Sequence, residues 1–303
     1  MPTPGRPIAE IMRAAQSAGL AIPAFNIPHL PMMAGVVRAL RETETFGLIA
    51  VARLEWMKFE SRSLEAVAEE YGRQQDPRYT RLHLDHVPVI DEDQQRVDYR
   101  AILQAAIRAG YDSLMVDGSR LALAENIAAT RAAVELGHAA GLPVEAELGA
   151  VLGHEAGPLP PYEELFASGR GFTDPEEARR FVAESGVDWL SVSIGNIHGA
   201  ISGAAKSARK VEARLSIPHL ERLQRAIAVP LVLHGGSGIQ KRYILEGMRH
   251  GIAKINVGTA IRQAYEGARG AGAAAADAAV FEAVRKVIVE ELEIAGSARR
   301  LNG

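Results

Sequence analysis

Short runs of apolar and β-branched residues recur along the whole chain, and most are followed by a helical pattern. The eight runs cover residues 21–27, 47–52, 80–84, 113–116, 144–148, 189–194, 230–233 and 253–257. Successive runs begin on the order of 20 to 45 residues apart, which leaves room for a strand, a helix and two loops. No two runs are joined as a tight hairpin. The pattern therefore predicts an α/β protein, a single (β/α)8 TIM barrel over residues 1–303.

The segments between the runs carry helix signals. Residues 8–18 form an amphipathic pattern. Residues 98–109 and 124–140 are rich in alanine and leucine and end near Gly110 and Gly141. The sequence DPEE at 174–177 combines an N-cap, a proline in the first turn and acidic residues that the helix dipole favours. These signals predict helices that cover the barrel.

Two segments are predicted to be long loops on the face of the barrel that carries chemistry. Residues 149–171 are rich in glycine and proline, and residues 199–214 are rich in small residues but hold Lys206, Arg209 and Lys210. Long loops at this end of a barrel often act as lids.

Composition narrows the function classes. The hydrophobic fraction of 48% and the charged fraction of 23% are ordinary for a globular enzyme. The net charge of −3 gives no reason to expect a nucleic-acid or membrane partner. Cysteine is absent, which excludes disulfides, thiolate metal ligands and cysteine nucleophiles. The first residues lack an apolar run suited to a signal peptide, and no stretch approaches roughly 18 apolar residues, so we expect a cytoplasmic protein.

Histidines follow three of the predicted strands. His86, His198 and His234 come after the third, sixth and seventh runs, and in a parallel barrel these ends open onto one mouth. Three neutral imidazoles with one open position suit a catalytic zinc ion. The alternative is that each is a hydrogen-bonded barrel histidine. Of the others, His83 is expected in the core or beside the ligands, and the rest on the surface or on helices: His29, His138, His154, His219 and His250.

Glycine-rich turns follow the last two predicted strands. Residues 234–238 (HGGSG) lead toward a helix expected from Ile239, and residues 255–259 (INVGT) lead into another helix. Converging backbone N–H groups in such turns bind oxyanions, and barrels of this class frequently bind phosphate after strands seven and eight. The alternative is a pair of tight turns.

Four carboxylates lie at the predicted mouth. Asp85 adjoins a proposed ligand and is expected to act as a general acid or base, although it could instead only orient a histidine. Asp117 and Glu147 end the fourth and fifth runs, as alternative metal ligands, supports of the ligands or plain hydrogen-bonding groups. Glu155 lies in the loop after the fifth run, where a solvated charge is the default.

Taken together, these segments resemble the class II, metal-dependent fructose-bisphosphate and tagatose-bisphosphate aldolases. The likeness covers nearly the whole chain and runs through these motifs in order: PAFN at 23–26, HLDH at 83–86, VDGS at 116–119, ENI at 125–127, VEAELG at 144–149, TDPEEA at 173–178, IGNIHG at 194–199, LVLHGGSG at 231–238 and KINV at 254–257.

The resemblance implies a metal centre and two proton-transfer groups. His86, His198 and His234 would hold one catalytic zinc ion, and Asp117 and Glu147 match positions near an alternative metal site. Asp85 would exchange a proton with the aldehyde half, and Glu155 matches the loop glutamate that removes the proton beside the ketone.

The resemblance also implies a phosphorylated sugar substrate, such as fructose 1,6-bisphosphate, that is cleaved to dihydroxyacetone phosphate and an aldehyde. A monovalent cation, Na⁺ or K⁺, would accompany its phosphate, and the family suggests a homo-oligomer, either a dimer or a tetramer. The residues expected to contact substrate are Asn26, Gly199, Gly235, Ser237, Asn256 and Thr259.

Other functions stay open at this stage. Lys254 lies in a predicted strand and could form a Schiff base, but the histidines would then have no purpose. Where the family has a small glycine- and serine-rich turn, residues 52–59 read ARLEWMKF. We therefore hypothesise a different aldehyde partner, with Arg53 either meeting an anionic group or pairing with Glu55. A barrel that binds metal and phosphate without turnover is a further alternative.

Overall fold

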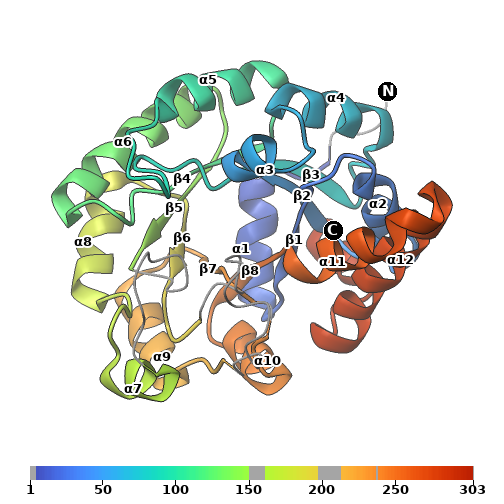
Figure 1. Ribbon diagram of the computed structural model, residues 1–303. Coiled ribbons are helices and arrows are strands. Elements are labelled where there is room, and N and C mark those ends of the chain that lie inside the picture. Colours follow the sequence, from blue (N-terminus) through green and yellow to red (C-terminus); the bar gives the residue numbers. More distant parts are fainter. Residues whose placement is uncertain (1–4, 150–160, 197–212, 237, 303) are drawn as a thin grey trace.

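Eight parallel strands form a closed barrel in the computed structural model, which describes residues 5–149, 161–196, 213–236 and 238–302. The strands follow one another around the ring in chain order, and β1 pairs with β8 to close it (Figure 1). Their bounds are β1 (Ile22–Asn26), β2 (Gly47–Ala52), β3 (Thr80–Asp85), β4 (Ser113–Val116), β5 (Val144–Leu148), β6 (Trp189–Val192), β7 (Leu231–Leu233) and β8 (Ile252–Val257).

The predicted (β/α)8 barrel is confirmed, and each predicted run contains a strand whose ends differ from the prediction by at most two residues. Nearly every strand residue is buried, because one side faces the barrel interior and the other faces the helices. Strands covered on both faces read as continuous apolar runs without alternation. Ionisable residues in or directly after these strands, such as Asp85, Glu147 and His234, are therefore exceptions to the pattern.

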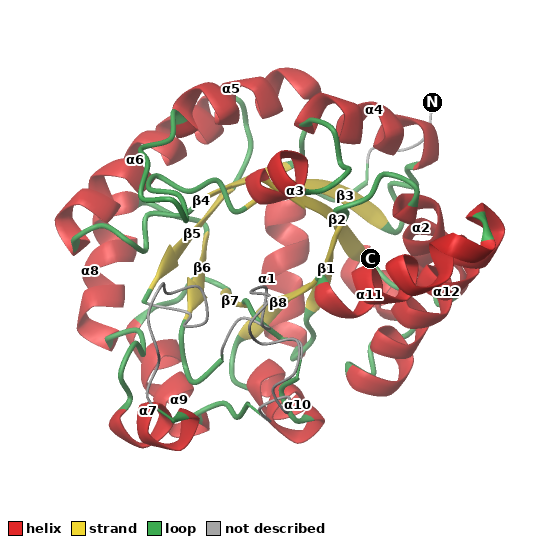
Figure 2. Cartoon of the chain, in the orientation of Figure 1, coloured by secondary structure: helices red, strands yellow, loops and turns green. Residues whose placement is uncertain are grey.

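Helices surround the barrel, as Figure 2 shows. They are α1 (Ile8–Ala18), α2 (Met32–Glu42), α3 (Arg53–Lys58), α4 (Leu64–Gln74), α5 (Tyr99–Ala109), α6 (Leu123–Ala139), α7 (Tyr162–Ser168), α8 (Pro175–Ser185), α9 (Ile217–Ala226), α10 (Lys241–Arg249), α11 (Thr259–Ala268), α12 (Ala273–Lys286) and α13 (Ser297–Asn302). Because α1 contacts β8 and leads directly into β1, it covers the N-terminal end of the barrel, and the mouth at the other end is left for chemistry.

The predicted caps are present. The Asp174 carboxylate accepts hydrogen bonds from the backbone N–H groups of Glu176 and Glu177 at 2.9 and 3.0 Å. Asp98 caps α5 in the same way, and Gly110 ends that helix with φ of 86°, a left-handed conformation that glycine adopts at little cost.

Local differences from the predictions lie at the mouth. A short helix, α3, occupies the segment for which no element was predicted, and α7 lies within the predicted loop 149–171. The helix expected from Ile239 begins at Lys241. Residues 150–160 and most of the loop 199–214 lie outside the described residues. Within the described residues, no helix has the length and apolar character needed to cross a bilayer.

Candidate active site

Two of the three predicted metal-binding histidines meet at the mouth of the barrel. His86 directly follows β3 and His234 directly follows β7, and their ring centroids lie 4.4 Å apart. One side-chain nitrogen from each ring and one carboxylate oxygen of Asp85 lie within 4.8 Å of one another. His198 lies outside the described residues, so its place at the site stays a prediction.

Carboxylates orient both imidazoles. His234 is fully buried; its Nδ1 lies 2.9 Å from Oε2 of Glu147, and its Nε2 lies 2.9 Å from Oε1 of Glu145. Nδ1 of His86 lies 3.4 Å from Oδ2 of Asp117, whose other oxygen accepts two hydrogen bonds from Ser119. A carboxylate behind a histidine fixes the ring and increases its basicity as a ligand. In this structure, Asp117 and Glu147 therefore support the imidazoles.

The backbone at His86 is strained. Its φ of 27° lies in the left-handed region, which non-glycine residues rarely adopt. Its carbonyl accepts a hydrogen bond from the backbone N–H of Arg53 at 3.3 Å. Strain of this kind is often found at functional sites, where the surrounding structure holds it in place.

The charges at the site favour a bound cation. Burial opposes protonation of His86, but the carboxylates of Asp85, Asp117 and Glu147 outweigh it and raise the pKa of His86 to about 10. The pKa of His234 is also raised, because hydrogen bonds to Glu145 and Glu147 outweigh its burial and the charge of His86. A divalent cation would replace these protons on the imidazoles and neutralise the same carboxylates. The donor set therefore fits a metal ion.

Asp85 is a buried carboxylate held by two amides. Asn26 Nδ2 donates to its Oδ2 at 2.9 Å, and Asn256 Nδ2 donates to both of its oxygens at 3.0 Å. Burial alone would raise the pKa of Asp85, but the charges of His86 and Lys254 hold it well below its usual range. Asp85 is therefore ionised at neutral pH and can accept a proton.

An ion pair lies beneath these groups inside the barrel. Lys254 Nζ lies 2.8 and 3.0 Å from the two carboxylate oxygens of Glu145, and 3.9 Å from Oδ1 of Asp85. The Lys254 side chain has no exposed surface. Glu145 also accepts a hydrogen bond from the indole N–H of Trp189 at 2.6 Å. These contacts give Lys254 a charge-balancing role, which a neutral Schiff-base lysine would not fill.

His83 lies in the core beside this ion pair. Its Nδ1 lies 2.9 Å from Oγ of Ser113, and its Nε2 is buried without a hydrogen bond and lies 3.6 Å from Glu145. Burial and the charge of Lys254 lower the pKa of His83 to about 4. His83 is thus a neutral core histidine, one of the two positions expected for it.

The predicted phosphate site is described only in part. Gly235 has a φ of 67°, and a Cβ on Gly236 would lie 2.9 Å from Ile255, so the turn after β7 depends on its glycines. Thr259 begins α11, whose N-terminal N–H groups suit an anion. Asn256 donates its amide to Asp85, and its Oδ1 is buried without a hydrogen bond. Gly199 and Ser237 lie outside the described residues, as does the predicted base Glu155.

Two carboxyl groups at the mouth were not among the predicted site residues. Glu145 alternates with Glu147 on β5, and residues two apart on a strand face the same side, so this signal was present in the sequence. Glu55 comes from the unpredicted helix α3, and its carboxylate accepts a hydrogen bond from the backbone N–H of Ala52 at 2.8 Å. Its position depends on a helix that local sequence did not indicate.

Two further expectations are corrected. Arg53 NH1 lies 3.5 Å from Oδ2 of Asp91, so Arg53 pairs with the loop after β3 and not with Glu55. His29 was expected at the surface or on a helix, but only 4% of it is exposed, and its ring nitrogens lie 3.0 Å from Glu60 and 3.2 Å from Glu266. The two acidic partners come from distant segments, which local sequence cannot reveal.

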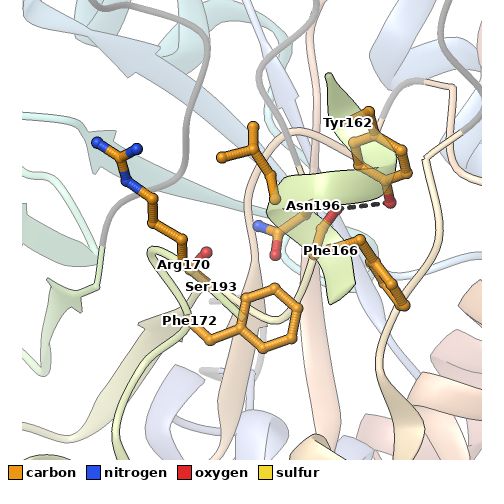
Figure 3. A pocket seen from close by; sticks show the side chains of 8 residues that line it. Tyr162, Phe166, Arg170, Phe172, Ser193 and Asn196 are labelled. Carbon is orange, nitrogen blue, oxygen red and sulfur yellow. Dashed lines mark hydrogen bonds between the residues drawn. The ribbon is translucent and has the colours of Figure 1, made fainter. Parts of the chain in front are cut away.

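A small pocket lies beside the β6 end of the mouth (Figure 3). Its lining includes Phe166, Phe172 and Asn196. The Tyr162 hydroxyl lies 3.0 Å from the carbonyl oxygen of Gly195 and accepts a hydrogen bond from the backbone N–H of Arg214. These contacts join α7 to the segments before and after residues 197–212. Among the described residues that line this pocket there is no histidine and no carboxylate.

Comparisons with known proteins agree with the barrel fold. The family model for class II fructose-bisphosphate aldolase matches residues 6–300. The crystal structure of the YdjI aldolase from Escherichia coli K12 is 28% identical, with a TM-score of 0.74, over 96% of this chain and 98% of that one. A putative fructose-1,6-bisphosphate aldolase from Coccidioides immitis is 26% identical, with a TM-score of 0.74, over 95% and 96%.

A fructose-bisphosphate aldolase from Campylobacter jejuni shares the fold at 17% identity, with a TM-score of 0.72, over 95% of this chain and 94% of that one. A barrel with paired imidazoles and buried carboxylates at its C-terminal mouth has a candidate metal site. The chain belongs to the class II fructose-bisphosphate aldolase family, because the family model matches nearly its whole length.

Proposed function

We propose that this protein is a zinc-dependent aldolase that reversibly cleaves a ketose phosphate into dihydroxyacetone phosphate and an aldehyde. The observation that carries the proposal is the pair of imidazoles, His86 and His234, whose rings lie 4.4 Å apart among buried carboxylates at the mouth. His198 would complete the ligand set. Catalytic zinc sites commonly have three protein ligands and leave one position for substrate.

The metal would supply one part of the chemistry. Removing a proton beside a ketone leaves negative charge on oxygen, and a bound divalent ion acts as a Lewis acid where that charge develops. His86 and His234 would hold the ion, and Asp117 would keep the His86 ring in place. Because Glu145 and Glu147 contact the two ring nitrogens of His234, one of them would keep its contact while the other nitrogen binds the ion.

Asp85 is the proposed proton acceptor in the cleavage direction. Its carboxylate is ionised, and the amides of Asn26 and Asn256 hold it beside the imidazoles. It would take the proton from the substrate hydroxyl as the carbon–carbon bond breaks, so that an aldehyde forms. In the synthesis direction it would return that proton to the same oxygen. Glu155 is proposed to move the proton on the ketone-side carbon.

The substrate's phosphate would bind at the turns after β7 and β8. Gly235 and the N-terminal end of α11 at Thr259 supply backbone N–H groups there, and Gly199 and Ser237 are proposed to complete the site. A monovalent cation is proposed to accompany this phosphate.

The test is a cleavage assay on a panel of ketose 1-phosphates and 1,6-bisphosphates, with release of dihydroxyacetone phosphate coupled to NADH oxidation. We expect activity that chelation abolishes and zinc restores. Asp85→Asn should lower kcat by about 10² to 10⁴, the usual contribution of a positioned acid or base.

Asp112→Asn is the matched control. Asp112 comes just before β4, at the end of the barrel opposite the mouth, where its carboxylate accepts a hydrogen bond from the backbone N–H of Leu82. Asparagine keeps an oxygen that can accept this bond, so activity should stay close to that of the wild type. If no ketose phosphate is cleaved by the zinc-loaded protein, the proposed function is wrong.

A further inference from the structure

Residues 53–59, which include α3, lie at the mouth beside the proposed site. The backbone N–H of Arg53 donates to the carbonyl of His86 at 3.3 Å, which joins the start of α3 to a proposed metal ligand. In Figure 1, α3 lies at the ends of β2 and β3. The aldehyde half of a substrate reacts next to Asp85 at the end of β3, so residues 53–59 are placed to contact it.

Acidic residues of the loop after β3 already pair with both cations of this segment. Arg53 pairs with Asp91 at 3.5 Å, and the two side chains are only 19% and 9% exposed. Lys58 Nζ lies 2.7 Å from Oε1 of Glu92. Within residues 53–59, all of which the structure describes, neither cation is therefore left to neutralise an anionic group of a substrate.

Glu55 of this segment places a carboxyl group near Asp85 and His86. Glu55 accepts a hydrogen bond from the backbone N–H of Ala52 at 2.8 Å, and its carboxyl group lies close enough to Asn26 and Asp85 for both to affect its pKa. The amide of Asn26 in turn donates to Asp85 at 2.9 Å. Glu55 thus lies near the proposed proton acceptor and near the amide that holds it.

Two physical consequences follow. Burial, together with the negative charge of Asp85, raises the pKa of Glu55 to about 8, so near neutral pH this group is mostly a neutral carboxylic acid. A carboxylic acid offers one O–H donor and one carbonyl acceptor, which match the hydroxyl groups of a sugar. An anion bound here would be repelled by the negative charge of Asp85.

We infer that this enzyme takes an uncharged, hydroxyl-bearing aldehyde as its second substrate, and that Glu55 is the residue that selects for it. This inference rests on the proposed aldolase function and specifies the chemistry of the aldehyde half of the substrate. It replaces the earlier hypothesis that Arg53 meets an anionic group, because Asp91 already binds the Arg53 guanidinium.

The experiment measures aldol synthesis from dihydroxyacetone phosphate and a set of aldehydes. The set contains D-glyceraldehyde, D-glyceraldehyde 3-phosphate and the carboxylate-bearing succinic semialdehyde. The quantity of interest is the ratio of kcat/KM for D-glyceraldehyde to kcat/KM for each anionic aldehyde. Because both values come from one enzyme preparation, a lower folded fraction cancels in the ratio.

For the wild-type enzyme we expect a ratio above about 10, the size of preference that one matched polar contact provides. Glu55→Ala should lower it by about tenfold. Asp91→Asn should lower it by about fivefold, because it releases the Arg53 cation but keeps an oxygen for the backbone N–H groups of Asp93 and Gln95. Glu65→Ala, at an exposed position in the first turn of α4, is the control and should leave the ratio unchanged.

Two results would overturn the inference: a wild-type preference for either anionic aldehyde, or a Glu55→Ala ratio within about twofold of wild type. Failure of the proposed function looks different. Exchange of the C3 proton of dihydroxyacetone phosphate in D₂O, followed by NMR, needs no aldehyde. If the zinc-loaded enzyme shows neither this exchange nor synthesis with any aldehyde, the aldolase assignment itself fails.

Discussion

The buried ion pair between Lys254 and Glu145 makes a sharp prediction about stability. Lys254→Met keeps the volume of the side chain but removes the charge that lies 2.8 Å from Glu145. Removing one partner of a buried pair typically costs about 3 to 5 kcal/mol, because the other charge is left uncompensated. Trp189 and His234 still hydrogen-bond Glu145, so we expect a loss near the lower end, about 3 kcal/mol.

The assay is equilibrium unfolding in urea of the metal-free wild type, Lys254→Met, Glu145→Gln and the double variant. The double variant buries no uncompensated charge in this pair, so it should be more stable than Lys254→Met by about 2 kcal/mol, since neutral replacements of buried pairs are often tolerated. If Lys254→Met loses less than about 1 kcal/mol, or if the two single losses simply add, the reasoning about this pair is wrong.

Two further predictions concern the core and the mouth. The pKa of His83 is lowered to about 4 from the usual 6.5, so its contribution to stability is complete above about pH 6.5 and is lost as the pH falls toward 4. The free energy of unfolding in urea should fall as the pH is lowered through that range, and His83→Asn should make this fall smaller by up to about 3 kcal/mol. An equal fall in the wild type and the variant would refute the conclusion that His83 is a neutral core histidine. Gly118→Ala should cost about 1 to 3 kcal/mol, because its Cβ would lie 2.2 Å from Oδ1 of Asn126, whose amide holds the backbone of Glu147. The control Gly72→Ala, with open space around the added methyl within α4, should be neutral or slightly stabilising in the same unfolding assay, and equal losses in the two variants would contradict the argument.

The barrel could be predicted from the sequence because its strands are buried on both faces. Such strands are short apolar runs, and the helices between them begin at signals such as Asp174 and end at signals such as Gly110. The meeting of His86 with His234 also followed from topology, since parallel strands place their carboxyl ends at one mouth. The local hydrophobic pattern and the closed parallel barrel were sufficient to predict both the fold and the meeting of these two histidines.

The ion-pair and hydrogen-bond partners of side chains near the mouth could not be predicted in the same way. Arg53 has Glu55 two positions away, yet it pairs with Asp91, because the short helix α3 turns the two side chains apart. His29 is buried between acidic residues of the segment after α3 and of α11, segments far apart in the sequence. Such contacts depend on how loops pack in three dimensions, and local periodicity carries no signal for them. Glu145 is the exception, since its alternation with Glu147 on β5 was visible.

The most direct test of the central claim is zinc K-edge X-ray absorption of the protein loaded with one equivalent of zinc. The account predicts scattering from three imidazoles with Zn–N distances of about 2.0 to 2.1 Å, and loss of one imidazole in His234→Ala. A spectrum with only oxygen ligands, or one that His86→Ala and His234→Ala both leave unchanged, would contradict it.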